Sequence, residues 1–175
     1  MGKCSAYILE IMKGRRNGPA DAPVKGVLLV LSWVYGAAVR LIDLSYRTGF
    51  RKTSHAGIPT VSVGNLTLGG TGKTPFAIFL ADHLTAAGRN PAILTRGYGK
   101  DESRMLKEEL ADVPVFVGQD RLKSAARAAA AGRDVLVLDA GFQHRRIERD
   151  FNILMLDGTC PFGNGKLFPR GVLRE

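Results

Sequence analysis

A glycine-rich segment between a predicted strand and a predicted helix constrains the fold of this chain more than any other feature. An apolar, β-branched run at 58–63 leads into Gly64-Asn65-Leu66-Thr67-Leu68-Gly69-Gly70, and Thr71-Gly72-Lys73-Thr74 follows just before a helical pattern. Strand, glycine-rich turn, Gly-Lys-Thr and helix in this order are the context of a phosphate-binding loop. Glycines let backbone N–H groups close around an oxyanion, and the new helix points its positive end at it.

Each position of this loop has a predicted role. Lys73 supplies a positive charge for the β- and γ-phosphates of a nucleotide, and Thr74 supplies a hydroxyl ligand for Mg²⁺. The backbone contacts to the phosphates are predicted to come from Gly69, Gly70, Thr71 and Gly72. The usual pattern G-x-x-x-x-G-K-[ST] begins with glycine, whereas Thr67 stands there in this chain. A flexible glycine-rich loop before an ordinary helix is therefore the alternative interpretation.

Alternating strand-like and helical stretches after the loop predict an α/β fold. Apolar strands are predicted at 91–95, 113–117, 134–139 and 151–157, and helices from the loop to about residue 87, at 102–110 and at 119–131. Continuous apolar strands that alternate with helices are typical of a parallel sheet covered on both faces. We therefore expect a P-loop NTPase-like, mostly parallel sheet with helices on both faces, and a sheet of this kind often has more than five strands.

The region before the loop is basic and contains one long apolar stretch. Up to Lys52, nine basic residues stand against three acidic ones, so most of the net charge of +9 lies there. Residues 26–39 carry no charge, and Trp33 and Tyr35 within them favour the headgroup layer of a membrane. The stretch is shorter than the roughly 20 residues of a spanning helix. It predicts a helix lying in, or dipping into, a membrane face, with a buried helix of the domain as the alternative.

Composition and cysteine usage argue against several other classes of protein. A chain of 175 residues with 45% apolar and 23% charged content suits one globular α/β domain. Cys4 and Cys160 form neither a disulfide framework nor a metal-ligand pattern. The basic region lacks an aromatic stacking pattern and any nucleic-acid motif, so no nucleic acid is expected as a partner. We expect a flexible leader at 1–23, a membrane-associated helix and linker at 24–52, and the phosphate-loop domain at 53–175.

Acidic residues follow two of the predicted strands, at the sheet edge where open α/β folds bind ligands. Asp139 ends the strand at 134–139 and is the expected magnesium ligand, with a capping carboxylate as the alternative. Asp101 and Glu102 follow the turn Gly97-Tyr98-Gly99. They are candidates for a magnesium ligand or a general base, or they form the acidic start of a helix.

Further polar candidates stand at the same predicted edge. Arg96 lies beside the glycine turn and is a candidate phosphate contact or an ordinary surface arginine. Gln143 and His144 follow Asp139 within Gly141-Phe142-Gln143-His144-Arg145-Arg146. His144 is a candidate for orienting substrate or moving a proton, and a capped turn with a solvated basic pair is the alternative.

Several of these segments, in one order, resemble the tetraacyldisaccharide 4′-kinase family, the lipid A kinases. The segments that carry the resemblance are 62–75, Arg96-Gly97-Tyr98-Gly99, Asp101-Glu102, Val117-Gly118-Gln119-Asp120-Arg121, 139–146, Phe162-Gly163-Asn164-Gly165-Lys166 and Leu173-Arg174-Glu175. The resemblance covers residues from about 24 to the end of the chain. It also accounts for Thr67, because the loop of this family is atypical at that position.

The resemblance implies an activity, a location and roles for residues. The activity is transfer of the γ-phosphate of ATP, with Mg²⁺, to the 4′-hydroxyl of a tetraacylated glucosamine disaccharide 1-phosphate in lipid A biosynthesis. The location is the cytoplasmic face of the bacterial inner membrane, with that acylated disaccharide phosphate lipid and the membrane surface as partners. By resemblance, Asp101 is the base with Glu102 beside it, and Lys73, Thr74 and Asp139 serve the nucleotide and Mg²⁺. Arg96 and Glu175 match further positions of the site.

The chain departs from the family pattern at three points. Ala140 stands where the family has a second aspartate, and the segment between Gly99 and Asp101 is shorter than usual. The family also continues past Glu175 into a second domain, so we expect 53–175 to be a truncated kinase domain. A membrane-associated nucleotide-binding fragment with little or no catalysis is therefore the alternative function. Another P-loop enzyme, such as a small-molecule ligase, is disfavoured by the apolar N-terminal helix.

Overall fold

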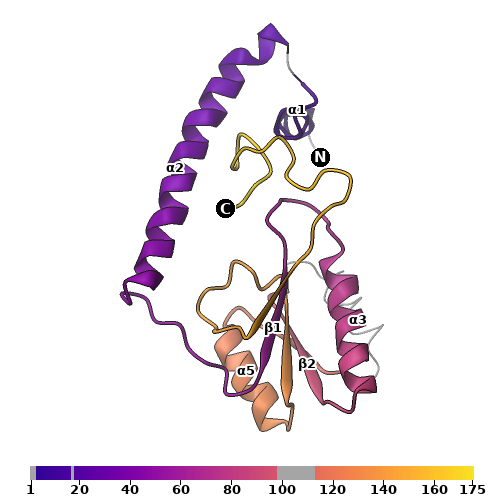
Figure 1. Ribbon diagram of the computed structural model, residues 1–175. Helices are drawn as coiled ribbons and strands as arrows, with labels where there is room; N and C mark the ends of the chain where they lie inside the picture. The colour runs from indigo at the N-terminus through magenta and orange to yellow at the C-terminus, as the bar shows by residue number, and fades with distance from the viewer. Residues whose placement is uncertain (1–2, 17, 98–112) are drawn as a thin grey trace. The chain divides into compact units, whose positions relative to one another are not determined.

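The computed structural model describes residues 3–16, 18–97 and 113–175, with side chains from Ala6 onward (Figure 1). Their contacts divide the chain into two compact units. The sheet unit comprises Arg51–Asn65 and Gly70–Met155, and the helical unit comprises Met1–Phe50, Leu66–Gly69 and Leu156–Glu175. Each unit is described by itself below.

Five parallel strands form the sheet unit, as the alternating pattern predicts. They are β1 (Thr60–Gly64), β2 (Pro91–Thr95), β3 (Val115–Val117), β4 (Val135–Asp139) and β5 (Phe151–Leu154). Their order across the sheet is β3-β2-β4-β1-β5, and every neighbouring pair is parallel. The strands lie within the ranges predicted from the sequence, except that β1 starts at Thr60 and extends to Gly64.

Two helices cover opposite faces of this sheet. They are α3 (Lys73–Ala86) and α5 (Arg121–Ala130), seen on the two sides of the strands in Figure 1. Along β4, Val137 packs into the cluster under α3, whereas Leu136 and Leu138 pack into the cluster that contains α5. Because side chains alternate between the faces of a strand, a sheet with two covered faces requires apolar residues at every position. The strand sequences are continuously apolar because both faces of the sheet are covered.

The start of α5 lies two residues later than the sequence predicts. The side chain of Asp120 accepts hydrogen bonds from the backbone N–H groups of Leu122 and Lys123, at 3.1 and 3.3 Å. An aspartate in this position satisfies amides that have no partner within the helix. Asp120 is therefore the N-cap, and the helix begins at Arg121.

The order of strands brings the ends of β1 and β4 together. The chain passes from β1 through α3 to β2, beyond β4, and then returns from β3 through α5 to β4. Such crossovers are right-handed in nearly all proteins, so two crossovers in opposite directions place their helices on opposite faces. The register pairs Val63 with Asp139, one residue before the end of β1. Asp139 thus stands beside the point where the glycine-rich loop begins.

Strand β5 forms one end of the sheet and is far more exposed than its neighbours. Phe151 is 68% exposed and Leu154 is 39% exposed, whereas every residue of β4 is buried. Neither face of β5 is covered as the two faces of β4 are. Apolar side chains at an end strand are consequently accessible to solvent.

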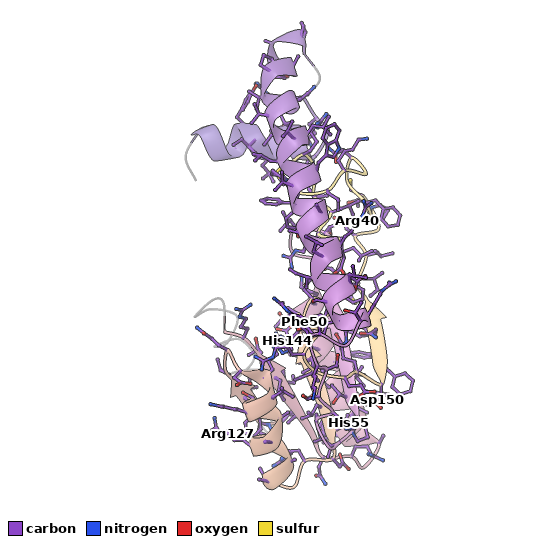
Figure 2. The ribbon with its side chains drawn as sticks, turned by 90° about the vertical axis from the view of Figure 1, so that its left-hand side faces the viewer. Arg40, Phe50, His55, Arg127, His144 and Asp150 are labelled. Carbon is purple, nitrogen blue, oxygen red and sulfur yellow. The ribbon has the colours of Figure 1, made fainter. Side chains whose placement is uncertain are left out.

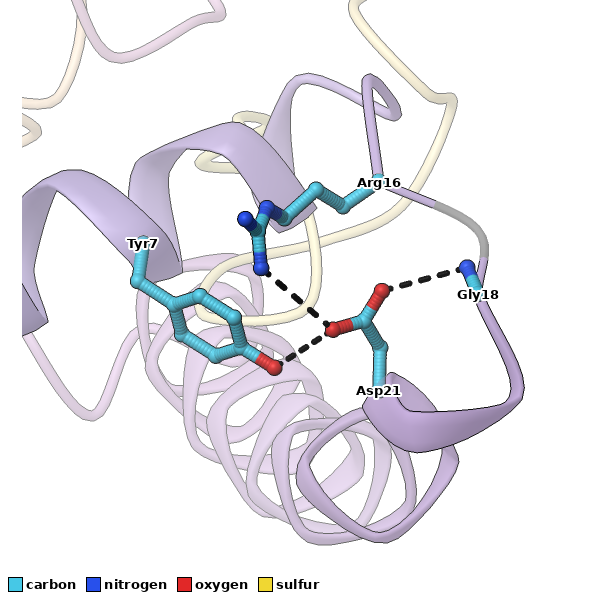
Figure 3. A network of polar contacts seen from close by, with 4 residues as sticks. All are labelled: Tyr7, Arg16, Gly18 and Asp21. Carbon is cyan, nitrogen blue, oxygen red and sulfur yellow. Dashed lines mark hydrogen bonds and ion pairs between the residues drawn. The ribbon is translucent and has the colours of Figure 1, made fainter.

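The helical unit begins with α1 (Lys3–Met12), within the leader at 1–23 that was expected to be flexible. Ile11 and Met12 at the end of α1 are buried, which favours an ordered helix there. Asp21 accepts a hydrogen bond from the Tyr7 hydroxyl at 2.6 Å and one from the Gly18 N–H at 3.1 Å, and it pairs with Arg16 at 3.8 Å (Figure 3). The Tyr7 hydroxyl holds the pKa of Asp21 below its ordinary value. This network ties α1 to the start of α2.

The long apolar helix is α2 (Ala22–Arg47), which follows the short helix η1 (Pro19–Asp21). By length and composition, the stretch Pro19–Arg47 could cross a membrane, and an 18-residue window within it has a mean hydropathy of 1.8. Side chains project along the whole of α2, with Arg40 among them (Figure 2). The buried positions are Leu28, Ser32 and Gly36, which recur every four residues and so lie on one side of the helix. The exposed large apolar residues are Val27, Val30, Leu31, Trp33, Val34, Leu41, Ile42 and Leu44.

Candidate phosphate-binding site

The glycine-rich loop has the backbone conformation that a turn into a helix N-terminus requires. Gly72 is the N-cap of α3 with φ +74°, in the left-handed region that L-residues avoid. A side chain built at Gly70 or Gly72 would meet nothing within 4 Å, so space remains beside the backbone of both. Gly69, with φ +132°, precedes this section and belongs to the helical unit. Open backbone at a helix N-terminus is what an anion needs.

Thr74 and Asp139 form the central contact of the site. Thr74 lies in the first turn of α3, and its hydroxyl donates to Asp139 Oδ2 at 3.2 Å. Asp139 is only 3% exposed. Arg121 donates to the backbone oxygen of Asp139 at 2.7 Å, which fixes the end of β4. A hydroxyl and a carboxylate side by side at a phosphate loop are the protein ligands of nucleotide-bound Mg²⁺.

The donor set suits Mg²⁺ in particular. In the described parts of the chain, no three His, Cys, Asp or Glu side chains gather into a metal-binding group. Mg²⁺ is usually held by one or two carboxylates together with phosphates and water, and does not need a cage built by the protein. Thr74 and Asp139 therefore fit a magnesium ion that arrives with a nucleotide.

Two glycines without a predicted role, Gly64 and Gly141, let the turn after β4 approach the end of β1 closely. A Cβ at Gly64 would lie 2.2 Å from Phe142 Cβ, and one at Gly141 would lie 2.6 Å from Leu138 Cβ. The Gly141 N–H donates to Val63 O at 3.0 Å. The turn after β4 therefore packs directly on the end of β1. A glycine directly after an apolar strand, as at Gly64, was the available signal for this close approach.

Gln143 reaches the beginning of the loop. Its side-chain Nε2 donates to the backbone oxygen of Asn65 at 2.9 Å. Asn65 follows β1 and is buried. The side chain of Gln143, predicted as a site residue, thus contacts the backbone of the loop and links the loop to the turn after β4.

His144 lies in the turn after β4 (Figure 2), and the charges of four arginines act on it. Its backbone N–H donates to Gly141 O at 2.9 Å. Burial, together with the positive charges around it, lowers the pKa of His144 from 6.5 to about 4; these charges belong to Arg121, Arg146, Arg96 and Arg149. At neutral pH the imidazole is uncharged. The positive potential that these arginines create favours an anionic ligand.

Comparison with known proteins decides the family of this chain. A sequence model described as LpxK, tetraacyldisaccharide-1-P 4′-kinase, matches residues 24–175. The chain belongs to the LpxK family. The resemblance inferred from the motifs is thereby confirmed.

The LpxK relatives are similar over nearly all of this chain. The tetraacyldisaccharide 4′-kinase of Desulfatibacillum aliphaticivorans is 42% identical over 91% of this chain and 50% of the relative. That of Geobacter sulfurreducens is 37% identical over 98% of this chain and 56% of the relative. The chain therefore spans about half the length of the curated relatives that it matches.

A solved LpxK structure has the same fold. The crystal structure of LpxK from Aquifex aeolicus in complex with ATP superposes with a TM-score of 0.78 at 33% identity. The match covers 87% of this chain and 54% of that one. The expected P-loop NTPase-like sheet with helices on both faces is confirmed.

The other residues predicted for the site lie at several places in this chain. Lys73 is the first residue of α3 and is partly exposed, and Arg96 follows β2 and is exposed. Glu175 belongs to the helical unit. Asp101 and Glu102, with the predicted helix at 102–110, lie outside the described residues. The structure thus brings Thr74 and Asp139 into contact at the end of the loop, and Gln143 contacts the start of the loop at Asn65.

Ala140 adopts an unusual backbone conformation directly after Asp139. Its φ is +50°, in the left-handed region, and no other non-glycine residue of the described chain has a positive φ. The backbone oxygen of Ala140 accepts a hydrogen bond from Arg121 at 3.3 Å. An alanine in this conformation is strained, whereas glycine, asparagine and aspartate adopt it more readily.

Proposed function

We propose that this chain supplies the ATP- and magnesium-binding part of a tetraacyldisaccharide 4′-kinase. The reaction transfers the γ-phosphate of ATP to the 4′-hydroxyl of tetraacyldisaccharide 1-phosphate, a step of lipid A biosynthesis. The observation that carries the proposal is the contact of Thr74 with Asp139 beneath a glycine-rich loop, in a chain of the LpxK family. A relative of the same fold is described in complex with ATP.

The roles in this proposal follow from the chemistry of each group. The loop amides from Gly69 to Gly72 and the ammonium of Lys73 bind the phosphates, and Thr74 and Asp139 hold Mg²⁺. When bound, Mg²⁺ offsets negative charge on the β- and γ-phosphates. Gln143 fixes the start of the loop through Asn65.

The acceptor side of the proposed reaction relies on the family resemblance. Asp101 takes the proton of the attacking hydroxyl, with Glu102 beside it, and the arginines around His144 attract the phosphorylated lipid. Arg96 and Glu175 serve the same acceptor side.

The exposed apolar side of α2 supports a location at a membrane. Trp33 is 67% exposed and Val34 is 63% exposed, and no charge interrupts residues 26–39. Burying such side chains in the headgroup and acyl boundary is favourable, and the basic flanks favour anionic lipid. The proposed location is the cytoplasmic face of the bacterial inner membrane, where an acylated substrate is available.

A second candidate is a membrane-associated nucleotide-binding fragment without catalysis. One observation favours it: Ala140 stands where the family pattern has an acid. This candidate predicts binding of ATP without transfer.

Measurement of transfer distinguishes the two. The chain in detergent micelles is given ATP labelled at the γ-phosphate and tetraacyldisaccharide 1-phosphate, with and without Mg²⁺, and lipid-bound label and ATP affinity are both measured. Labelled lipid supports the kinase, whereas ATP binding without label supports the second candidate. A chain without magnesium-dependent ATP affinity contradicts both.

Lys73→Ala tests the assignment of the loop. We expect this change to abolish transfer, with ATP affinity at least tenfold lower because a charge facing the phosphates is lost. Lys123→Ala is the matched control, since Lys123 is exposed on α5. Membrane association should be unchanged in both variants. Its loss in Lys73→Ala would contradict the separation of the loop from the membrane helix.

A further inference from the structure

The buried side of α2 is hydrogen-bonded to the segment 166–174 within the helical unit. The Ser32 hydroxyl lies 2.8 Å from the backbone oxygen of Leu167 and accepts the N–H of Arg170 at 2.8 Å. The Ser32 hydroxyl has one proton, which is shared between the Leu167 oxygen and the backbone oxygen of Leu28 in α2, at 2.9 Å. Ser32 is only 4% exposed. One buried serine of an otherwise apolar helix therefore fixes two backbone groups of a distant segment.

Tyr35 and Gly36 extend this contact by one helical turn. The Tyr35 hydroxyl donates to the backbone oxygen of Arg174 at 2.8 Å, and its ring meets Phe168 edge to face with centroids 5.6 Å apart. A Cβ at Gly36 would lie 2.9 Å from Leu167 Cδ1. The segment thus lies close against α2 from Leu167 to Arg174.

The same segment pairs with the first part of the phosphate loop. The Leu68 N–H donates to Val172 O at 2.8 Å, and the Arg174 N–H donates to Leu66 O at 2.8 Å. Thr67 and Leu173 form an antiparallel bridge between them. Leu66, Thr67 and Leu68 directly precede Gly69-Gly70-Thr71-Gly72-Lys73-Thr74 in the chain. The entrance of the loop is therefore held by the segment that Ser32 and Tyr35 hold.

We propose that Ser32 and Tyr35 are positioning residues for the phosphate loop, acting through 167–174 on Leu66–Leu68. Arg174 is the point where both sets of bonds meet, because its oxygen binds Tyr35 and its N–H binds Leu66. The apolar helix then has a task besides contact with lipid: its buried side orders the loop that takes ATP. The effect on ATP affinity rests on the proposed function, whereas the ordering of the loop entrance does not.

The expected fall in ATP affinity without these hydroxyls follows from the entropic cost of ordering a loop. A loop whose entrance is already fixed loses less conformational freedom when a ligand binds, so its affinity is higher. Without the two hydroxyls, the entrance opens more often and must be ordered by ATP itself. Affinity for ATP therefore falls, while the contacts that Thr74 and Asp139 make with bound nucleotide and Mg²⁺ stay the same.

Hydrogen exchange of backbone amides tests the ordering directly. The chain in detergent micelles is compared with the double variant Ser32→Ala, Tyr35→Phe, and exchange is read at the amides of Leu68 and Arg174. We expect roughly tenfold faster exchange at both amides, since two hydrogen bonds of typical strength are lost. Val34→Ala, on the exposed side of α2, is the control and should leave both amides unchanged. Unchanged exchange in the double variant would overturn the proposal.

ATP affinity separates positioning from a general structural role. The double variant should bind Mg²⁺–ATP several-fold more weakly, and Ser32→Thr with Tyr35 intact should restore affinity because it keeps the hydroxyl. A lower melting temperature with unchanged ATP affinity would overturn the proposal. If the double variant does not fold, Tyr35→Phe alone, which keeps the ring on Phe168, is read in the same way. Should the unaltered chain bind no ATP, the proposed function fails, and the amide exchange still decides the ordering.

Discussion

Thr74 and Asp139 are 65 residues apart in the chain, and their contact depends on β1 and β4 being neighbours. A buried carboxylate is unfavourable unless hydrogen bonds or cations compensate it. At Asp139 the Thr74 hydroxyl donates such a hydrogen bond to the carboxylate, and in the proposed function Mg²⁺ is the cation. This residue is thus suited to a site that is loaded with a cation during the reaction.

Asp139→Asn removes the charge and keeps the size of the side chain. We expect ATP affinity in the presence of Mg²⁺ to fall at least about tenfold, because the metal loses its carboxylate ligand. Affinity without Mg²⁺ should change little. Calorimetric titration with and without Mg²⁺ measures both, with Asp134→Asn, at the partly exposed position just before β4, as control. Equal magnesium dependence in Asp139→Asn and the unaltered chain would contradict the assignment.

Ala140→Gly should stabilise the chain. Glycine adopts a φ of +50° without strain, and the left-handed conformation costs an L-residue about 1–2 kcal/mol. Glycine also has more freedom when unfolded, so we expect a net gain of up to about 1 kcal/mol in the free energy of unfolding. Urea denaturation measures it. Ala126→Gly, in the exposed interior of α5, should lose about 1 kcal/mol, and a similar loss in Ala140→Gly would show that residue 140 is not strained.

The depressed pKa of His144 predicts a loss of stability in acid. In the folded chain the group binds its proton only near pH 4, whereas the unfolded chain binds it near pH 6.5. Between these values the unfolded state holds more protons, so stability falls as pH decreases from about 6.5 toward 4. His144→Gln should flatten this slope in thermal melts recorded across that range. An unchanged slope in His144→Gln would contradict this assignment of the acid sensitivity to His144.

Among the elements, α2 combines two sides with different tasks. Its buried side carries Ser32 and the small Gly36 against 167–174, and its exposed side carries large apolar residues. The sequence indicated the apolar character but not which positions face inward, because nearly all of 26–39 is apolar. The segment 167–174, which packs against α2, decides which positions are buried, and the position of that segment depends on the fold.

A charge on the exposed side of α2 should weaken lipid binding. We expect Val34→Glu to reduce sedimentation with vesicles of anionic lipid at least about tenfold, since a charge must then be transferred into the membrane boundary. The melting temperature should hardly change, because Val34 is 63% exposed. Ala126→Glu, exposed on α5, carries the same charge change as control. Equal loss in both variants would point to net charge rather than to the apolar side.

Helix α3 illustrates how far periodicity predicts packing. Phe76, Leu80 and Leu84 recur every four residues along α3 and pack against the core, but they are only partly buried. The most buried positions are Ala77, Ile78 and Ala81. Alanine allows the helix backbone to approach the sheet closely, and a search for large apolar residues does not reveal it.

At the scale of the whole molecule, the sequence predicted what is local and missed what depends on distant contacts. The loop, the strands and the place of Asp139 follow from short patterns with a known mechanism. The contact of Gln143 with Asn65 and that of Ser32 with Leu167 join segments that no short pattern connects. Arg121 drew attention only as part of a family motif, although its side chain fixes the end of β4.

The accessible end of the sheet at β5 bears on how this polypeptide behaves in concentrated solution. A terminal strand with solvent-facing Phe151 and Leu154 is a template on which strands of other molecules can add. We expect association of molecules through this strand to increase as protein concentration rises. Experiments that require a monomer should use dilute samples or the variant Phe151→Lys.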